Sequence, residues 1–249
     1  MNVCEVIPLV FQESGTRVVF ADVNEESLCL DFKQLFSNLD MFSGMLFVHT
    51  YGTERSFESL FLEIKRSASD FIIIDDRCLC MPSLSTPDTV ADICLYSVGE
   101  KKQVDLGCGG YAFMQDYLKY SYSPLKTGSF LYDNPWVLNQ ELLVQKTVES
   151  VSQRECLNDI YRELLPYQIQ FKEEFQNWRF NIRVSNKDRV LDALFSDGLF
   201  ASSHYRPISP LGGPSNSAWL FDHVINLFND SHFTVEMAER TCKIINRLL

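Results

Sequence analysis

The sequence has 249 residues, 46% of them hydrophobic, with a formal net charge of −11 and a pI of about 4.8. This length fits one large domain, or one domain with a small appendage, and this composition excludes global disorder. The acidic balance argues against a nucleic-acid-binding protein, which needs a basic surface to displace phosphate counterions. No apolar run reaches the roughly 18 residues that span a bilayer, and no basic flank marks a signal peptide. We therefore expect a cytoplasmic protein that does not contact membranes.

Short apolar runs alternate with helical patterns in the first half of the chain. The runs cover residues 17–23, 44–49, 71–74, 93–97 and 110–114, and helical spacing covers residues 28–39 and 56–67. Apolar runs without polar alternation are typical of strands buried on both faces. The pattern predicts an α/β fold with a mixed, mostly parallel sheet flanked by helices.

The second half of the chain has a different pattern. Helical spacing covers residues 137–177 with an interruption at Pro166, a strand pattern covers 178–184, and helices cover 187–196 and 234–249. These segments predict a smaller C-terminal α+β domain. We place the boundary within residues 132–139, which divides the chain into a truncated α/β domain, 1–135, and a second domain, 136–249.

Two features of the first half carry reactive side chains. Asp76 follows an apolar run, and functional residues of parallel sheets lie where such strands end. A buried carboxylate needs a partner. The partner of Asp76 could be the protonated ring of a ligand. The alternatives are a salt bridge to Arg77 or Lys101, or a helix cap. The one close cysteine pair, Cys78 and Cys80, has no second pair beside it, so we expect no metal site.

The second feature is the segment SVGEKKQVDLGCGG at residues 97–110. Lys101 and Lys102 follow the end of a predicted strand, and each disfavours the charge of the other, which favours a nucleophilic amine. The glycines that follow permit unusual backbone angles or a close approach to a ligand. The alternative is an exposed basic turn before a hairpin.

Five segments resemble, in order, the DegT/StrS family of sugar aminotransferases, which depend on pyridoxal 5′-phosphate (PLP). They are FADV at 20–23, VHTYG at 48–52, IIIDD at 72–76, ADICLYSVGEKKQVDLGCGG at 91–110 and SHY at 203–205. The resemblance implies the aspartate aminotransferase fold and a homodimer. It also implies transfer of an amino group from an amino donor to a keto-sugar nucleotide, for the amino sugars of surface polysaccharides.

The resemblance assigns roles residue by residue. Lys102 matches the lysine that binds PLP covalently, Asp76 the aspartate that pairs with the pyridine nitrogen, and Ser97 the serine that binds the phosphate. His204 and Tyr205 are candidate substrate contacts, with a packed loop anchor as the alternative.

Departures from the family pattern support a second hypothesis. The sequence begins after the position of the family's phosphate-binding Gly-Thr-Ala turn, Leu79 replaces a Gln or His that contacts the ring, and the residue before Lys102, which is Lys101, differs from that of the family. Loss of several charge-assisted hydrogen bonds would weaken cofactor binding. The second hypothesis is therefore a catalytically impaired homologue, which binds a nucleotide-sugar or serves as an accessory subunit of a full-length aminotransferase.

Overall fold

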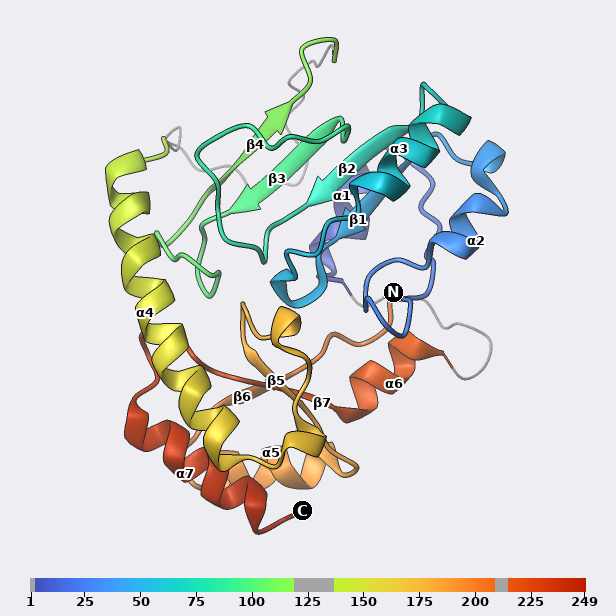
Figure 1. Ribbon diagram of the computed structural model, residues 1–249. Helices are drawn as coiled ribbons and strands as arrows, with labels where there is room; N and C mark the ends of the chain where they lie inside the picture. Colours follow the sequence, from blue (N-terminus) through green and yellow to red (C-terminus); the bar gives the residue numbers. More distant parts are fainter. Residues whose placement is uncertain (1–2, 119–136, 209–214) are drawn as a thin grey trace.

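The computed structural model describes residues 3–118, 137–208 and 215–249, and its first half is built on a four-stranded sheet (Figure 1). The strand order is β1-β2-β3-β4, with β1, β2 and β3 parallel and β4 antiparallel to β3. Their bounds are Gly44–Val48, Ile72–Asp76, Ile93–Ser97 and Gly110–Met114. The predicted mixed, mostly parallel sheet is confirmed.

Apolar residues of alternating positions hold this sheet to its helices. Phe47, Ile73 and Tyr96 point to one face and pack against Phe61 and Ile64 of α3. The helices of this half are α1 (Val6–Glu13), α2 (Phe32–Phe36) and α3 (Glu58–Ser67), with 3₁₀ turns at Leu39–Met41 and Thr50–Gly52. Side chains on the opposite face of β1, β2 and β3 are mostly only half-buried, and that face carries Asp76 and Ser97.

The second half is a three-stranded antiparallel sheet covered by helices, which confirms the predicted α+β class but contains more strands than the one predicted at 178–184. Its strand order is β5-β7-β6, with bounds Phe180–Arg183, Val224–Leu227 and Ala201–Ser203. The helices are α4 (Gln140–Leu164), α5 (Lys187–Ser196), α6 (Asn216–His223) and α7 (Val235–Asn246). Short 3₁₀ turns at Tyr167–Ile169 and Glu173–Phe175 follow the break that Pro166 makes after α4.

Helix α4 connects the two halves (Figure 1). Near its start Leu143 packs against Val98 and Val104 of the first half, whereas Leu157 and Tyr161 lie in the core of the second. Most of the predicted domain boundary, residues 132–139, lies outside the described residues, so the division at residue 135 stays a prediction.

The predicted strand at residues 17–23 is wrong. The segment contains only an isolated bridge, between Val23 and Leu30, because no neighbouring strand of the described chain reaches it. The helix expected at 28–39 shortens to α2, since Leu28 has a left-handed φ of 56° and Asp31 caps the helix by accepting from Lys33 N.

Candidate active site

Strand β2 ends in two aspartates whose side chains point to opposite faces of the sheet. Asp75 is fully buried on the helix-covered face, where Oδ1 lies 2.8 Å from His49 Nε2 and Oδ2 accepts from Arg77 Nε at 2.6 Å. Burial alone would raise the pKa of Asp75, but the hydrogen bonds and charges of His49 and Arg77 outweigh it and hold that pKa below its ordinary value. Asp75 is therefore ionised, with two partners.

Both nitrogens of the buried His49 ring face acceptors. Nε2 faces Asp75, and Nδ1 lies 2.7 Å from the carbonyl oxygen of Thr53. His49, Asp75 and Arg77 thus form a closed hydrogen-bonded group that fixes the carboxyl ends of β1 and β2.

Asp76 lies on the other face and is 6% exposed. Its Oδ1 accepts from Cys78 N at 2.9 Å, which closes a turn after the strand. Among the described residues, no basic side chain forms an ion pair with Asp76. The predicted alternative of a salt bridge to Arg77 is wrong, because Arg77 bonds to Asp75. Asp76 is therefore a buried carboxylate with capacity for a cationic partner.

The charges of Asp76 and Lys102 both act on the thiol of Cys78. Burial, followed by the charge of Asp76, raises the pKa of the Cys78 thiol, whereas the charge of Lys102 acts in the opposite direction. The thiol of Cys78 is thus protonated and within reach of both charges. Lys102 itself is half-buried, and no hydrogen bond or ion pair of its amine is found in the part of the chain that the structure describes.

Ser97 lies on the same face of the sheet as Asp76. Asp76 is the register partner of Leu95, and Ser97 follows Leu95 by two residues, so both side chains project from one face. Ser97 is half-buried and pairs with Gly110 of β4, at the start of the loop that leads to Lys102.

The backbone around Lys102 is held by contacts from both halves of the molecule. Lys101 has a left-handed φ of 64°, an uncommon conformation for a side-chain-bearing residue. Its carbonyl accepts from Trp178 Nε1 at 2.8 Å, and its N–H donates to Asp105 Oδ2 at 3.0 Å. The next carbonyl, that of Lys102, accepts from Arg154 Nη2 at 3.1 Å.

Arg154 on α4 is a residue of this site that the sequence analysis did not single out. Its guanidinium is buried and also donates to the carbonyls of Gln103 and Trp178 and to Asn229 Oδ1. Burial, with the nearby charge of Arg179, lowers its pKa to about 10. Helical spacing could have indicated that Arg154 is buried, because it lies on the same face of α4 as the buried residues Leu143 and Leu157.

Close packing with the segments that follow β1 and β2 also fixes the loop that carries Lys102. Gln103 Nε2 donates to the carbonyl of Leu79 at 2.9 Å. A Cβ on Gly52 would lie 2.1 Å from that same carbonyl oxygen, and Gly52 has φ of 74°, so only glycine fits there. The Lys102 loop is therefore tied to the segment that follows Asp76.

His204 and Tyr205 follow β6. The His204 ring is buried, and its Nδ1 lies 2.6 Å from the hydroxyl of Tyr51, which follows β1. Burial, followed by the charge of Lys187, lowers the pKa of His204 to about 3, so the ring is neutral. This geometry favours the packed anchor for His204. Tyr205 is 45% exposed, and its role as a substrate contact stays a prediction.

The structure supplies two further observations on the predicted properties. No group of three or more potential metal-ligating side chains occurs within residues 3–118, 137–208 and 215–249. No helix in the same ranges has the length and hydropathy needed to cross a bilayer.

No family model and no curated protein matches the sequence. Solved structures share its fold. A DegT DnrJ EryC1 StrS aminotransferase from Brucella abortus is 16% identical, with a TM-score of 0.69 over 98% of this chain and 75% of that chain. DesV from S. venezuelae is 17% identical, with a TM-score of 0.73 over 99% and 76%. PseC from Helicobacter pylori, an aminotransferase involved in the biosynthesis of pseudoaminic acid, is 16% identical, with a TM-score of 0.70 over 96% and 75%. The chain therefore has the fold of the DegT/StrS-type sugar aminotransferases, as its five-segment resemblance implies.

Proposed function

We propose that this protein is a PLP-dependent aminotransferase that acts on a keto-sugar nucleotide. The observation that carries the proposal is Asp76, a buried carboxylate without a basic partner among the described residues. It lies on the same face as Ser97, and its charge and that of Lys102 both act on the Cys78 thiol. An ionisable group buried without a matched charge is costly unless a ligand supplies one. A protonated pyridine ring supplies that charge.

Three residues fit the cofactor by their chemistry. Asp76 would accept a hydrogen bond from the ring nitrogen, the hydroxyl of Ser97 would donate to the phosphate, and Lys102 Nζ would be the covalent anchor. When bound, PLP supplies an electron sink that stabilises negative charge on the substrate carbon. Lys102 Nζ would then carry the proton between substrate and cofactor, which requires the amine to be free of competing ion pairs.

The likeness to solved structures supports a sugar as the substrate. One similar structure, that of CalS13 from Micromonospora echinospora, is a sugar aminotransferase, and PseC is an aminotransferase involved in the biosynthesis of pseudoaminic acid. We extend this class to the present chain, with an amino donor as second substrate and products for surface polysaccharide. A cytoplasmic homodimer is the assembly that we expect.

A second candidate function is a nucleotide-sugar-binding or accessory subunit that has lost turnover. Leu79 is the observation that favours it. The resemblance assigns a ring-contacting Gln or His to that position, and Leu79 offers the ring only apolar contact, while its carbonyl already accepts from Gln103. Such a subunit would bind the sugar without forming the covalent link to PLP.

PLP titration of the purified protein separates the two. We expect an absorption band at the violet edge of the visible spectrum, and borohydride should fix the cofactor to Lys102. Lys102→Ala should abolish the band and the adduct, whereas Lys101→Asn, which removes the neighbouring amine and tolerates the left-handed backbone, should retain both. Asp76→Asn should weaken binding. Absence of the band at saturating PLP, with nucleotide-sugar still bound, would support the accessory subunit instead.

A further inference from the structure

Two strained backbone positions lie at the carboxyl edge of the first sheet. Tyr51, which follows β1, has φ of 57°, and Lys101, which follows β3, has φ of 64°. Residues with a Cβ rarely adopt this left-handed region, and they persist in it only where their surroundings hold them there. Leu28 is the one other described residue besides glycine with such an angle. Strain of this kind is concentrated at functional sites, so the contacts that hold Tyr51 and Lys101 bear on function.

One residue of the second half, Trp178, bonds to both positions. Its backbone N–H donates to the carbonyl of Tyr51 at 3.3 Å, and its indole Nε1–H donates to the carbonyl of Lys101 at 2.8 Å. The carbonyl of Trp178 accepts from the buried guanidinium of Arg154, and the guanidinium of Arg179 lies 5.0 Å from the centre of the indole ring. Trp178 therefore joins the loops that follow β1 and β3 to the second half of the molecule.

These contacts also fix the two peptide planes on either side of the Lys102 Cα. In the plane before it, the carbonyl of Lys101 accepts from Trp178, and the N–H of Lys102 donates to the carbonyl of Gly99 at 3.3 Å. In the plane after it, the carbonyl of Lys102 accepts from Arg154 Nη2 at 3.1 Å. Peptide groups are planar, so two fixed planes set φ and ψ of the residue between them and the direction of its Cα–Cβ bond. The second half therefore sets the direction in which the Lys102 side chain leaves the loop.

We propose that Trp178 is a positioning residue for Lys102, and that its indole N–H holds the Lys102 amine in place for the aldehyde of PLP. This role rests on the proposed function, in which Lys102 Nζ is the covalent anchor. The link forms when the neutral amine adds to the aldehyde carbon and one water leaves, with the aldehyde oxygen and both hydrogens of the amine. An amine that is already held in one direction loses less conformational freedom in this step than an amine on a mobile loop.

Trp178→Phe removes the indole N–H and keeps an aromatic ring beside Arg179. The apparent dissociation constant for PLP, measured by absorbance, should rise about fivefold, because one neutral hydrogen bond is lost. Trp219→Phe, at an exposed position of α6, is the matched control and should keep the parental affinity. Lys101→Gly in the Trp178→Phe background should restore the affinity to within about twofold of the parent, since glycine adopts the left-handed angle without the indole.

A second measurement needs no cofactor. Limited acetylation of the protein without PLP, read by peptide mass, should label Lys102 about threefold faster in Trp178→Phe than in the parent, because the half-buried amine becomes more accessible when the loop is released. The exposed Lys243 of α7 should be labelled at the same rate in both proteins. A parent that binds no PLP, with the expected change in Lys102 labelling, would refute the proposed function and support the role of Trp178.

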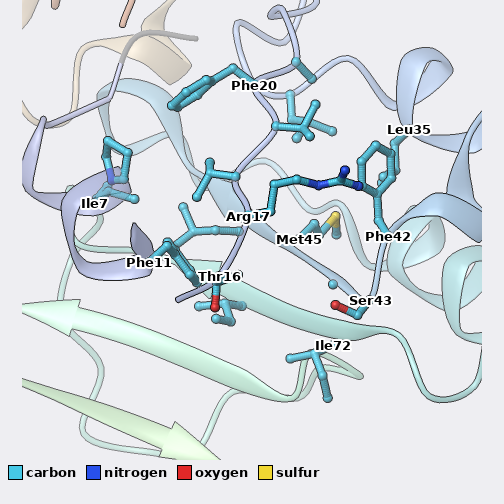
Figure 2. A pocket seen from close by; sticks show the side chains of 18 of the residues that line it. Ile7, Phe11, Thr16, Arg17, Phe20, Leu35, Phe42, Ser43, Met45 and Ile72 are labelled. Carbon is cyan, nitrogen blue, oxygen red and sulfur yellow. The ribbon is translucent and has the colours of Figure 1, made fainter. Parts of the chain in front are cut away.

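A destabilised variant away from the loop separates positioning from general loosening of the first half. A cavity of about 600 Å³ between α1, α2 and β1 is lined by apolar side chains such as Ile7, Phe11 and Leu35, and by no residue of 97–110 (Figure 2). Leu35→Ala removes a buried side chain of this lining, so it should lower the midpoint of urea unfolding and leave PLP affinity and Lys102 labelling unchanged.

Three results would overturn the role of Trp178. The first is parental PLP affinity in Trp178→Phe or, where the parent binds no PLP, a parental rate of Lys102 labelling. The second is an equal loss of affinity in Leu35→Ala. The third is a loss that Lys101→Gly does not recover, which would make the indole a direct contact of the ligand.

Discussion

The buried neutral ring of His204 predicts a specific loss of stability in mild acid. Its folded-state pKa is about 3, against an ordinary value of 6.5, because burial and the charge of Lys187 disfavour the protonated ring. Below pH 6.5 the unfolded chain binds a proton that the folded chain does not, so stability falls with pH down to about 3. Between pH 7 and pH 5 this group should lower the free energy of unfolding by about 2 kcal/mol.

Replacement of the ring isolates this effect. His204→Gln keeps an acceptor for the Tyr51 hydroxyl and cannot titrate, so urea unfolding of the variant should lose about 2 kcal/mol less than the parent between pH 7 and pH 5. His232→Gln is the matched control, because the His232 side chain is 82% exposed and its loss should leave the parental pH dependence. Equal acid losses in the parent and in His204→Gln would refute the buried-ring argument.

Two further predictions concern the contacts that join the halves of the molecule. Arg154→Met leaves the carbonyls of Lys102 and Gln103 without their donor and should lower the free energy of unfolding by about 3 kcal/mol. Arg162→Met, on the exposed face of α4, is the control and should lower it by less than about 1 kcal/mol. Similar midpoints of urea unfolding for the two variants would contradict the role of Arg154. Asp22 accepts from the first N–H groups of α6, so Asp22→Ala should cost about 1 to 2 kcal/mol in thermal unfolding, and an unchanged midpoint would exclude a capping role.

Most strands and helices that have a clear apolar pattern in their own residues were predicted from the sequence. The runs at β1, β2, β3 and β4 lack polar alternation, and the structure confirms each as a strand of the first sheet. Residues 17–21 have an equally strand-like sequence and remain unpaired. Pairing depends on a neighbour in space, which the residues of one segment do not encode. Strand β7, completely buried, was missed although its run Val224–Leu227 has the same apolar character.

The candidate site shows a similar division between local and long-range information. Placement of Asp76 at the end of β2 and of Lys102 after β3 followed from the apolar runs that precede them. The packing of Arg154 against the Lys102 loop, from a helix about 50 residues further along the chain, depends on how α4 crosses between the halves. No local pattern specifies that crossing.

The two adjacent aspartates at the end of β2 differ in their partners because their side chains point to opposite faces of the sheet. Alternation places Asp75 and Arg77 on one side, so the arginine serves Asp75 although it is adjacent in sequence to Asp76. His49 adds a second hydrogen-bond partner on that side, so both oxygens of the Asp75 carboxylate are engaged. Because Arg77 and His49 are already engaged by Asp75, neither of them pairs with Asp76 on the opposite face. Strict alternation at the end of β2 therefore gives one carboxylate two partners within the protein, while its neighbour has no basic partner among the described residues.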